Sequence, residues 1–212
     1  MKNRSLGCLL EVAETLALTL IIFLVIQNFV AQPFMVEQDS MERTLEPNQY
    51  VLVDKLTPRL QAYQRGDIVV FHPPDQPDTT VPYIKRIIGL PGDRLEFKDG
   101  AVWVNGQRLD EPYVFDGQPT LPGPLGSLVV VPPGEYFGMG DHRLDSTDSR
   151  VFGPIPAANI IGRAFLRYWP LGSLAILNVP TYADVPQASA GESPTAPAAM
   201  PSGQRPGQLI AV

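Results

Sequence analysis

A β-strand that runs directly into a tight turn is indicated by Tyr83-Ile84-Lys85-Arg86-Ile87-Ile88-Gly89-Leu90-Pro91-Gly92-Asp93. Tyrosine and isoleucine favour extended backbone, and the Gly and Pro residues that follow end the strand. The isoleucines make this strand strongly apolar around Lys85. Because side chains alternate along a strand, we expect Arg86 to point to the opposite face, into solvent.

Similar short apolar runs recur along the chain, separated by turns rich in Gly and Pro. One pair of runs flanks Asp99-Gly100, which is typical of a β-hairpin. The expected strands are Tyr50–Val53, Asp67–Phe71, Tyr83–Ile88, Arg94–Phe97, Ala101–Asn105, Ser127–Val131, Tyr136–Met139 and Ile160–Trp169. Many short strands with such turns predict an all-β domain, an antiparallel barrel or sandwich.

An uncharged segment of membrane length precedes these strands. Thr15 to Val36 contains no Asp, Glu, Lys or Arg over 22 residues. A helix of this length spans roughly 33 Å, against about 30 Å of bilayer hydrocarbon. We therefore expect one N-terminal transmembrane helix that ends at Pro33. The alternatives are a buried core helix, for which the segment is long, and a cleavable signal peptide, whose cut site requires a small residue where Phe29 stands.

The charges around this segment predict its orientation. Lys2 and Arg4 precede it and no positive charge lies just after it, which places the N-terminus in the cytoplasm. The expected division is a cytoplasmic N-terminus over 1–11, a transmembrane anchor over 12–33, a β-rich domain over 34–182 and a tail over 183–212. The tail is rich in Pro and Ala and lacks aromatic residues, so we expect it to be disordered.

The composition excludes several classes of function. A formal net charge of −6 without any basic block argues against nucleic-acid binding. Cys8 is the single cysteine, which rules out an internal disulfide and a zinc site built on paired cysteines. The two histidines, His72 and His142, do not have the spacing of metal ligands. We therefore expect no metal.

Two further motifs accompany the strand that contains Lys85. They are Ser40-Met41-Glu42-Arg43-Thr44-Leu45, just after the uncharged segment, and Gly140-Asp141-His142-Arg143-Leu144-Asp145-Ser146-Thr147-Asp148-Ser149-Arg150. In this order, the three motifs closely resemble those of the type I signal peptidases, which are membrane-anchored serine proteases with a lysine as general base. The resemblance covers roughly residues 10 to 180.

The resemblance implies a role for each matching residue. Ser40 corresponds to the nucleophile and Lys85 to the general base, and Ser146 would hydrogen-bond and orient the Lys85 amine. Asp148 and Arg150 would form a structural ion pair. A lysine acts as a base only when it is neutral, and burial in apolar surroundings favours that state by lowering its pKa from about 10.4.

The chain departs from the family pattern at four positions. Gln38 stands where many relatives have a serine that donates to the oxyanion, beside the first expected donor, the Ser40 backbone N–H. Arg43 replaces the motif proline, which removes a fixed φ and is expected to loosen the loop behind the nucleophile. His142 and Asp145 replace two asparagines and keep the ability to hydrogen-bond. The residues that do the chemistry are all present.

The resemblance also implies the substrate and the location. The family cleaves exported preproteins after Ala-x-Ala-like sites, and shallow apolar pockets explain this choice. Met35, Val36 and Ile84 are our candidates for the pocket walls, and we expect the substrate to add as a strand beside Lys85. The implied partners are preproteins and the lipid bilayer, with no cofactor. The implied location is the bacterial cell membrane, with the catalytic domain on the exported side.

Two other functions remain open at this point. A self-cleaving Ser/Lys protease of the LexA-type repressors is one, because the tail contains Ala188-Ser189-Ala190 and Ala196-Pro197-Ala198. The anchor and the lack of a DNA-binding helix pair count against it. The other is a membrane-tethered β-domain that binds peptides but has lost catalysis, with Gln38 and Arg43 as the residues responsible.

Overall fold

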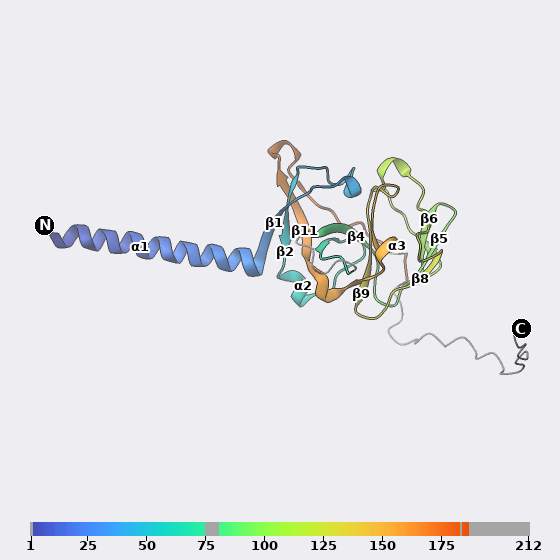
Figure 1. The fold of residues 1–212 in the computed structure, drawn as a ribbon, viewed down its shortest axis with the longest axis horizontal. Coiled ribbons are helices and arrows are strands. Elements are labelled where there is room, and N and C mark those ends of the chain that lie inside the picture. Colours follow the sequence, from blue (N-terminus) through green and yellow to red (C-terminus); the bar gives the residue numbers. More distant parts are fainter. Residues whose placement is uncertain (1, 75–80, 183, 187–212) are drawn as a thin grey trace, which may run out of the picture.

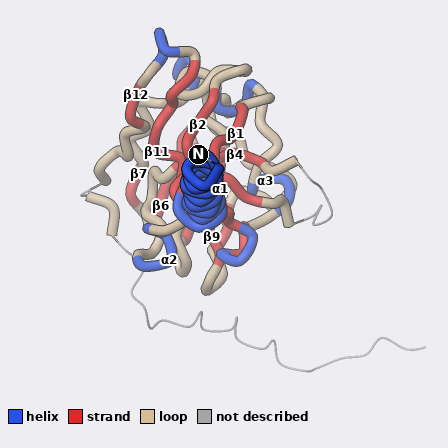
Figure 2. The backbone as a smooth tube through the Cα atoms, turned by 90° about the vertical axis from the view of Figure 1, so that its left-hand side faces the viewer, coloured by secondary structure: helices blue, strands red, loops and turns tan. Residues whose placement is uncertain are grey.

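The computed structural model describes residues 2–74, 81–182 and 184–186. A long helix, α1 (Lys2–Val25), continues into one π-helical turn, η1 (Ile26–Val30), and projects from a β-rich body (Figure 1). Figure 2 shows this helix nearly end-on, with the body behind it. Within the part of the chain that the structure describes, no helix has the length and apolarity needed to cross a membrane.

The N-terminal helix ends earlier than the sequence predicted. Residues Ala31–Met35 form strand β1 instead of the last turns of a helix. This strand pairs with β2 (Tyr50–Asp54), with Pro33 opposite Leu52. Proline has no N–H to donate, and β1 lies at the edge of its sheet, where a strand accommodates a proline. The predicted helix end at Pro33 was therefore wrong.

The body consists mostly of β-strands in two antiparallel sheets, which confirms the predicted β architecture. The larger sheet curls like half a barrel, has the order β1-β2-β11-β3-β4-β9-β10, and adds β12 against β11 (Figure 1). Its further strands are β3 (Ile68–Phe71), β4 (Tyr83–Gly89), β9 (Glu135–Met139), β10 (Ile155–Pro156), β11 (Ile160–Trp169) and β12 (Ala175–Ile176). The smaller sheet has the order β7-β6-β5-β8. It contains β5 (Arg94–Lys98), β6 (Ala101–Val104), β7 (Gln107–Arg108) and β8 (Leu128–Val130).

The strands expected from the sequence are all present, with ends that differ by at most one residue. Asp99 and Gly100 join β5 to β6 with positive φ angles of 54° and 69°, as a two-residue hairpin turn requires. The strands that the sequence analysis missed are β1, β7, β10 and β12, and three of these contain two residues each. Such short pairings leave no periodicity to detect.

Short helical turns connect the strands, and one of them carries Ser40. They are η2 (Asp39–Met41), α2 (Thr57–Leu60), η3 (Phe115–Gly117), α3 (Ser149–Phe152), η4 (Ala157–Asn159) and η5 (Leu171–Ser173). Val36 precedes Ser40, Met41 and Leu45 follow it, and all three are buried in one apolar cluster. These apolar contacts on both sides of Ser40 fix η2 against the larger sheet.

The predicted tail begins where the described chain nearly ends. Of residues 183–212, the structure describes only 184–186, and the two Ala-rich triplets of the tail lie outside the described residues. Val185 and Tyr182 pack, partly buried, against the apolar cluster that the smaller sheet shares with β4 and β9. The chain is therefore part of the packed body up to this point.

Candidate active site

The fold brings Ser40 and Lys85 into direct contact. Ser40 lies on η2 and Lys85 on β4, and the Lys85 Nζ donates a hydrogen bond to the Ser40 Oγ over 2.6 Å. The two residues are only 5% and 1% exposed. Forty-five positions separate them in the sequence, so the contact exists only because η2 packs on the larger sheet.

The surroundings of Lys85 disfavour its charge. Burial lowers the pKa of Lys85 from 10.5 to about 8, against the opposite effect of the Asp148 and Asp141 carboxylates. Neither carboxylate forms a hydrogen bond or ion pair with the amine. A much larger share of this amine is therefore neutral near pH 7 than for an exposed lysine, which is what a general base requires.

Gly140 lies between Ser40 and Ser146. A Cβ at this position would overlap the Ser40 carbonyl oxygen and the Ser146 Oγ. The structure thus brings Ser146 to the Ser40–Lys85 pair. The Ser146 Oγ is buried beside the Asp148 carboxylate and, against the effect of burial, helps to lower the pKa of that group, although it forms no hydrogen bond of ordinary geometry among the described residues. The bond that the resemblance implied between Ser146 and Lys85 is not formed here, and the amine donates to Ser40 instead.

Asp148 and Arg150 form an ion pair at the start of α3. The Arg150 Nε and Nη2 donate to the two Asp148 carboxylate oxygens over 2.9 and 2.8 Å. Asp148 also accepts from the Gly140 backbone N–H over 3.0 Å. Although burial acts in the other direction, the hydrogen bonds and charge of Arg150 hold the pKa of Asp148 below its ordinary value. The pair therefore fixes Gly140 beside Ser40.

Arg86 is buried, and its predicted exposure to solvent was wrong. It is 2% exposed, and its Nε and Nη2 donate to the two Asp141 carboxylate oxygens over 2.8 and 2.6 Å. Its guanidinium also donates to the Gly66 carbonyl and lies 4.0 Å from the centre of the Tyr113 ring. Apolar clusters cover both faces of β4, so alternation along this strand does not separate a solvent face.

Two residues of the third motif that the sequence analysis left without a role are also paired. Asp141 is the partner of Arg86, and the buried Arg143 forms an ion pair with Glu111. Arg143 further donates through Nε to the Gly140 carbonyl over 3.0 Å. The available signal was the position of Asp141 and Arg143 inside the third motif, next to the matching residues Ser146, Asp148 and Arg150.

An apolar cavity of about 310 Å³ lies between β1 and β4. The predicted wall residues Met35, Val36 and Ile84 all line it, and Gln38 does so as well. The remaining lining residues are Gln32, Pro33, Phe34, Glu37, Val51, Val70, Val81, Pro82 and Tyr83. Since Gln38 and Ile84 immediately adjoin the Ser40–Lys85 region, this cavity can hold small side chains of a bound peptide next to the serine.

Two departures from the family motif make specific contacts. Arg43 has a φ of 79°, which a proline cannot adopt, and its guanidinium donates to the Val114 carbonyl over 2.8 Å. His142 donates its backbone N–H to the Ser40 carbonyl over 3.1 Å. The His142 Nδ1 lies 3.1 Å from the Glu42 carboxylate, and its ring stacks on Phe115. The loop behind Ser40 is therefore tied down rather than loose. Asp145, the fourth departure, is exposed.

A buried serine and lysine in hydrogen-bond contact beside an apolar cavity define a candidate hydrolase of the serine class. Comparisons with known proteins agree. Residues 9–169 match the family model described as signal peptidase, peptidase S26. The chain therefore belongs to the signal peptidase family, and it is a peptidase.

Two curated relatives support the same assignment. The signal peptidase I of Leptolyngbya laminosa is 37% identical over 177 residues, which cover 81% of this chain and 85% of the relative. The signal peptidase I of Bacillus caldolyticus is 40% identical over 157 residues, covering 69% and 84% of the two chains. A crystal structure of a signal peptidase I from Enterococcus faecalis is 32% identical and covers 49% of this chain and 97% of its own, with a TM-score of 0.41.

Proposed function

We propose that this protein removes N-terminal signal peptides from exported preproteins after Ala-x-Ala-like sites, with Ser40 as nucleophile and Lys85 as general base. The observation that carries this proposal is the 2.6 Å hydrogen bond between the buried Lys85 Nζ and the Ser40 Oγ. A serine hydroxyl becomes an effective nucleophile only when a neighbouring base removes its proton. The lowered pKa of Lys85, about 8, supports this role.

The reaction follows the usual two steps of acyl transfer. The neutral Lys85 amine takes the Ser40 proton while the Oγ bonds to the scissile carbonyl carbon. The resulting ammonium gives that proton to the departing amine nitrogen as the C–N bond breaks, which leaves the signal peptide as an ester on Ser40. Water then hydrolyses the ester, with Lys85 again acting as base.

Other residues would support this reaction. The Ser40 backbone N–H and Gln38 are the candidate oxyanion donors, and Gln38 lines the cavity beside Ser40. The buried Ser146 hydroxyl would bond the Lys85 amine once the Ser40 proton is in transfer. Asp148 and Arg150 would hold the loop that contains Gly140 in place.

The cavity supports the binding of apolar side chains at the cleavage site. Its walls, which include Met35, Val36 and Ile84, would contact the alanine side chains of an Ala-x-Ala-like site. The peptide would lie in an extended conformation between β1 and β4 and place its carbonyl at Ser40.

The N-terminal segment would hold the enzyme at the membrane. Large apolar side chains along α1 and η1, among them Leu16, Phe23 and Phe29, are about half or more exposed, which is costly in water. We assign residues 12–30 to the anchor, which is shorter than the predicted 12–33 because Ala31–Met35 forms β1 of the body. Residues 1–11 would lie on the cytoplasmic side and 31–182 would form the catalytic domain on the exported side, with 183–212 as a tail. The location would be the bacterial cell membrane. This arrangement keeps Ser40 close to membrane-held preproteins.

Cleavage of a preprotein with an Ala-x-Ala site, in detergent, tests the proposal. The wild type and a surface control, Lys98→Ala, should cut at that site, whereas Ser40→Ala and Lys85→Ala should bind the signal peptide without cutting it. A wild type that binds the peptide but does not cut it would instead support a tethered peptide-binding domain, with Gln38 and Arg43 as the first residues to revert.

A further inference from the structure

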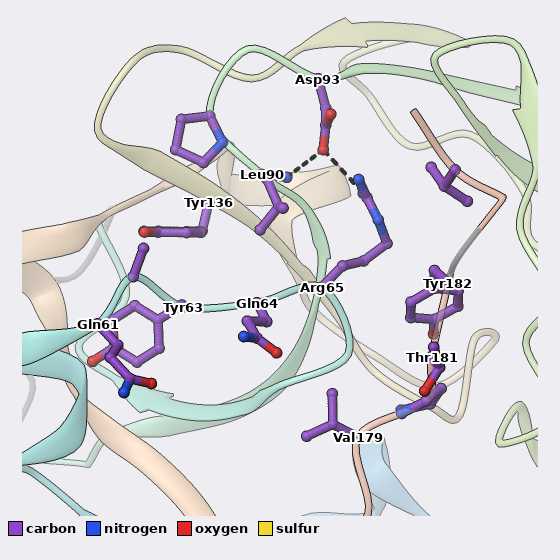
Figure 3. Close-up of a pocket in the computed structure, with 14 residues that line it drawn as sticks. Gln61, Tyr63, Gln64, Arg65, Leu90, Asp93, Tyr136, Val179, Thr181 and Tyr182 are labelled. Atoms are coloured by element: carbon purple, nitrogen blue, oxygen red, sulfur yellow. Dashed lines mark hydrogen bonds and ion pairs between the residues drawn. The ribbon is translucent and has the colours of Figure 1, made fainter. Parts of the chain in front are cut away.

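The segment of residues 179–182, called here the C-terminal strap, packs against the turn that contains Gly66. In Figure 3, Val179, Thr181 and Tyr182 line one side of a cavity of about 860 Å³, with Gln61 and Tyr63 on the other side. Gly66 is in close contact with the strap, because a Cβ there would lie 2.9 Å from Pro180 and 3.2 Å from Tyr182. Since the Gly66 carbonyl accepts from Arg86, the strap packs on a residue that holds Arg86 in place.

A chain of hydrogen bonds leads from the strap to the loop that contains Gly140. The Tyr182 hydroxyl donates to the Tyr113 hydroxyl over 2.9 Å, and the Tyr113 hydroxyl donates to the Glu111 carboxylate over 2.9 Å. Glu111 accepts from both terminal nitrogens of Arg143, over 2.9 and 2.5 Å. Arg143 then donates to the Gly140 carbonyl. The chain ends at the residue that separates Ser40 from Ser146.

Two side chains of this hydrogen-bond chain, Tyr113 and Arg143, are buried, and the other two, Tyr182 and Glu111, are partly buried. Tyr113 lies under the buried Arg86 guanidinium. Burial raises the pKa of Tyr182 to about 12, so its hydroxyl stays protonated and able to donate across the pH range in which the enzyme would work. Buried polar chains of this kind rigidify their surroundings when every member is paired.

We propose that Tyr182 is a positioning residue for catalysis: its hydroxyl orients Tyr113 and Glu111, and through Arg143 it holds Gly140 and the Ser40–Ser146 geometry. This inference rests on the proposed function. A positioning residue of this kind affects the rate of the chemical step more than the binding of the peptide, because the substrate cavity between β1 and β4 shares no lining residue with the strap.

The test is a set of hydroxyl deletions in the full-length protein, assayed on a peptide with an Ala-x-Ala site. Tyr182→Phe should lower kcat by about three- to tenfold with little change in KM, as expected for the loss of one buried hydrogen bond. Tyr113→Phe should lower kcat at least as much, and adding Tyr182→Phe to it should cost nothing more. Tyr63→Phe, a deletion on the opposite side of the same cavity, should leave both constants unchanged.

Each outcome has one meaning. Wild-type kcat in Tyr182→Phe, or a loss of Tm with unchanged kcat per folded molecule, would overturn the positioning role and leave Tyr182 as a packing residue. Additive losses in the double variant would show that Tyr182 does not act through Tyr113, which also overturns it. If the wild type itself does not cleave while Ser40→Ala binds equally well, the proposed function fails instead.

Discussion

Lys85 and Arg86 are neighbours on one strand, and both are buried basic residues. Their surroundings shift their pKa values in opposite directions. Arg86 has a bidentate carboxylate partner in Asp141 and keeps its charge, with a pKa above the ordinary value because the hydrogen bonds and charge of Asp141 outweigh its burial. Among the described residues, the Lys85 amine hydrogen-bonds to the Ser40 hydroxyl alone and lies near the Tyr83 ring, and its pKa is lowered to about 8. The difference shows that a partner, not depth of burial, decides whether a buried cation stabilises the fold or serves as a base.

Among substitutions that test this contrast between Lys85 and Arg86, Lys85→Met should have the largest effect. Cleavage should fall by at least about 10³-fold, because the base that activates Ser40 is lost. The free energy of unfolding near pH 7 should rise by about 3 kcal/mol, which is the cost of holding a lysine whose pKa is lowered from 10.5 to about 8. Unfolding by guanidinium chloride measures this change.

The direction in which the free energy of unfolding changes with pH follows from proton binding to Lys85. Between pH 8 and 10.5 the unfolded chain binds more protons at this lysine than the folded chain, so the wild type gains stability as the pH rises through this window. Below it, the full cost of the buried amine is present. Lys98→Met on β5 is the surface control and should change neither quantity. A Lys85→Met variant less stable than the wild type at pH 7 would contradict the account.

Removing the partner of Arg86 should instead lower the free energy of unfolding. Asp141→Asn leaves the buried Arg86 charge without its carboxylate and should lower the free energy of unfolding by about 3–5 kcal/mol. Thermal unfolding of the purified variant checks this value. Glu96→Gln removes a surface carboxylate from its Arg94 and Lys98 partners and should leave Tm nearly unchanged. Equal effects of the two substitutions would mean that burial of the pair has no energetic consequence.

A methyl group at Gly140 should disturb the position of Ser40 next to Lys85 without adding or removing a charge. Its Cβ would overlap the Ser40 carbonyl oxygen and the Ser146 Oγ, so Gly140→Ala should lower kcat by about 10²-fold through misplacement of the serine. Gly172→Ala has open space around the new Cβ and serves as the matched control. Steady-state kinetics measure both variants. Equal kcat values for Gly140→Ala and Gly172→Ala would show that Gly140 has no role in placing Ser40.

Arg43 should give the smallest effect. Arg43→Pro restores the residue that the family has at this position, yet a φ of 79° is closed to proline, so kcat should fall by about tenfold. Arg43→Gly allows the same φ and loses only the bond to Val114, so its kcat should stay within about threefold of the wild type. A faster Arg43→Pro enzyme would show that the loop behind Ser40 adopts the conformation of the family motif.

The sequence predicted the strands and the motif residues, but it did not predict that both faces of β4 are buried. Local patterns found the hairpin at Asp99-Gly100 and the strand that contains Lys85. The exposure of Arg86 was mispredicted because its partner Asp141 lies 55 positions away and no local pattern reveals a long-range ion pair. The Tyr182–Tyr113 hydrogen bond was missed for the same reason, since 69 positions separate the two hydroxyls. What depends on tertiary contact had to come from the structure.

Direct titration of the Lys85 amine tests the central claim most sharply. With lysine labelled at the ε-carbon, the Lys85 NMR signal is identified by its loss in Lys85→Met and followed from pH 6 to 12. The account predicts a midpoint near the value of about 8 that burial gives this amine, well below the ordinary lysine value of 10.5. A midpoint of 10 or above would mean that Lys85 stays charged like any surface lysine, and it would contradict the assignment of Lys85 as the general base.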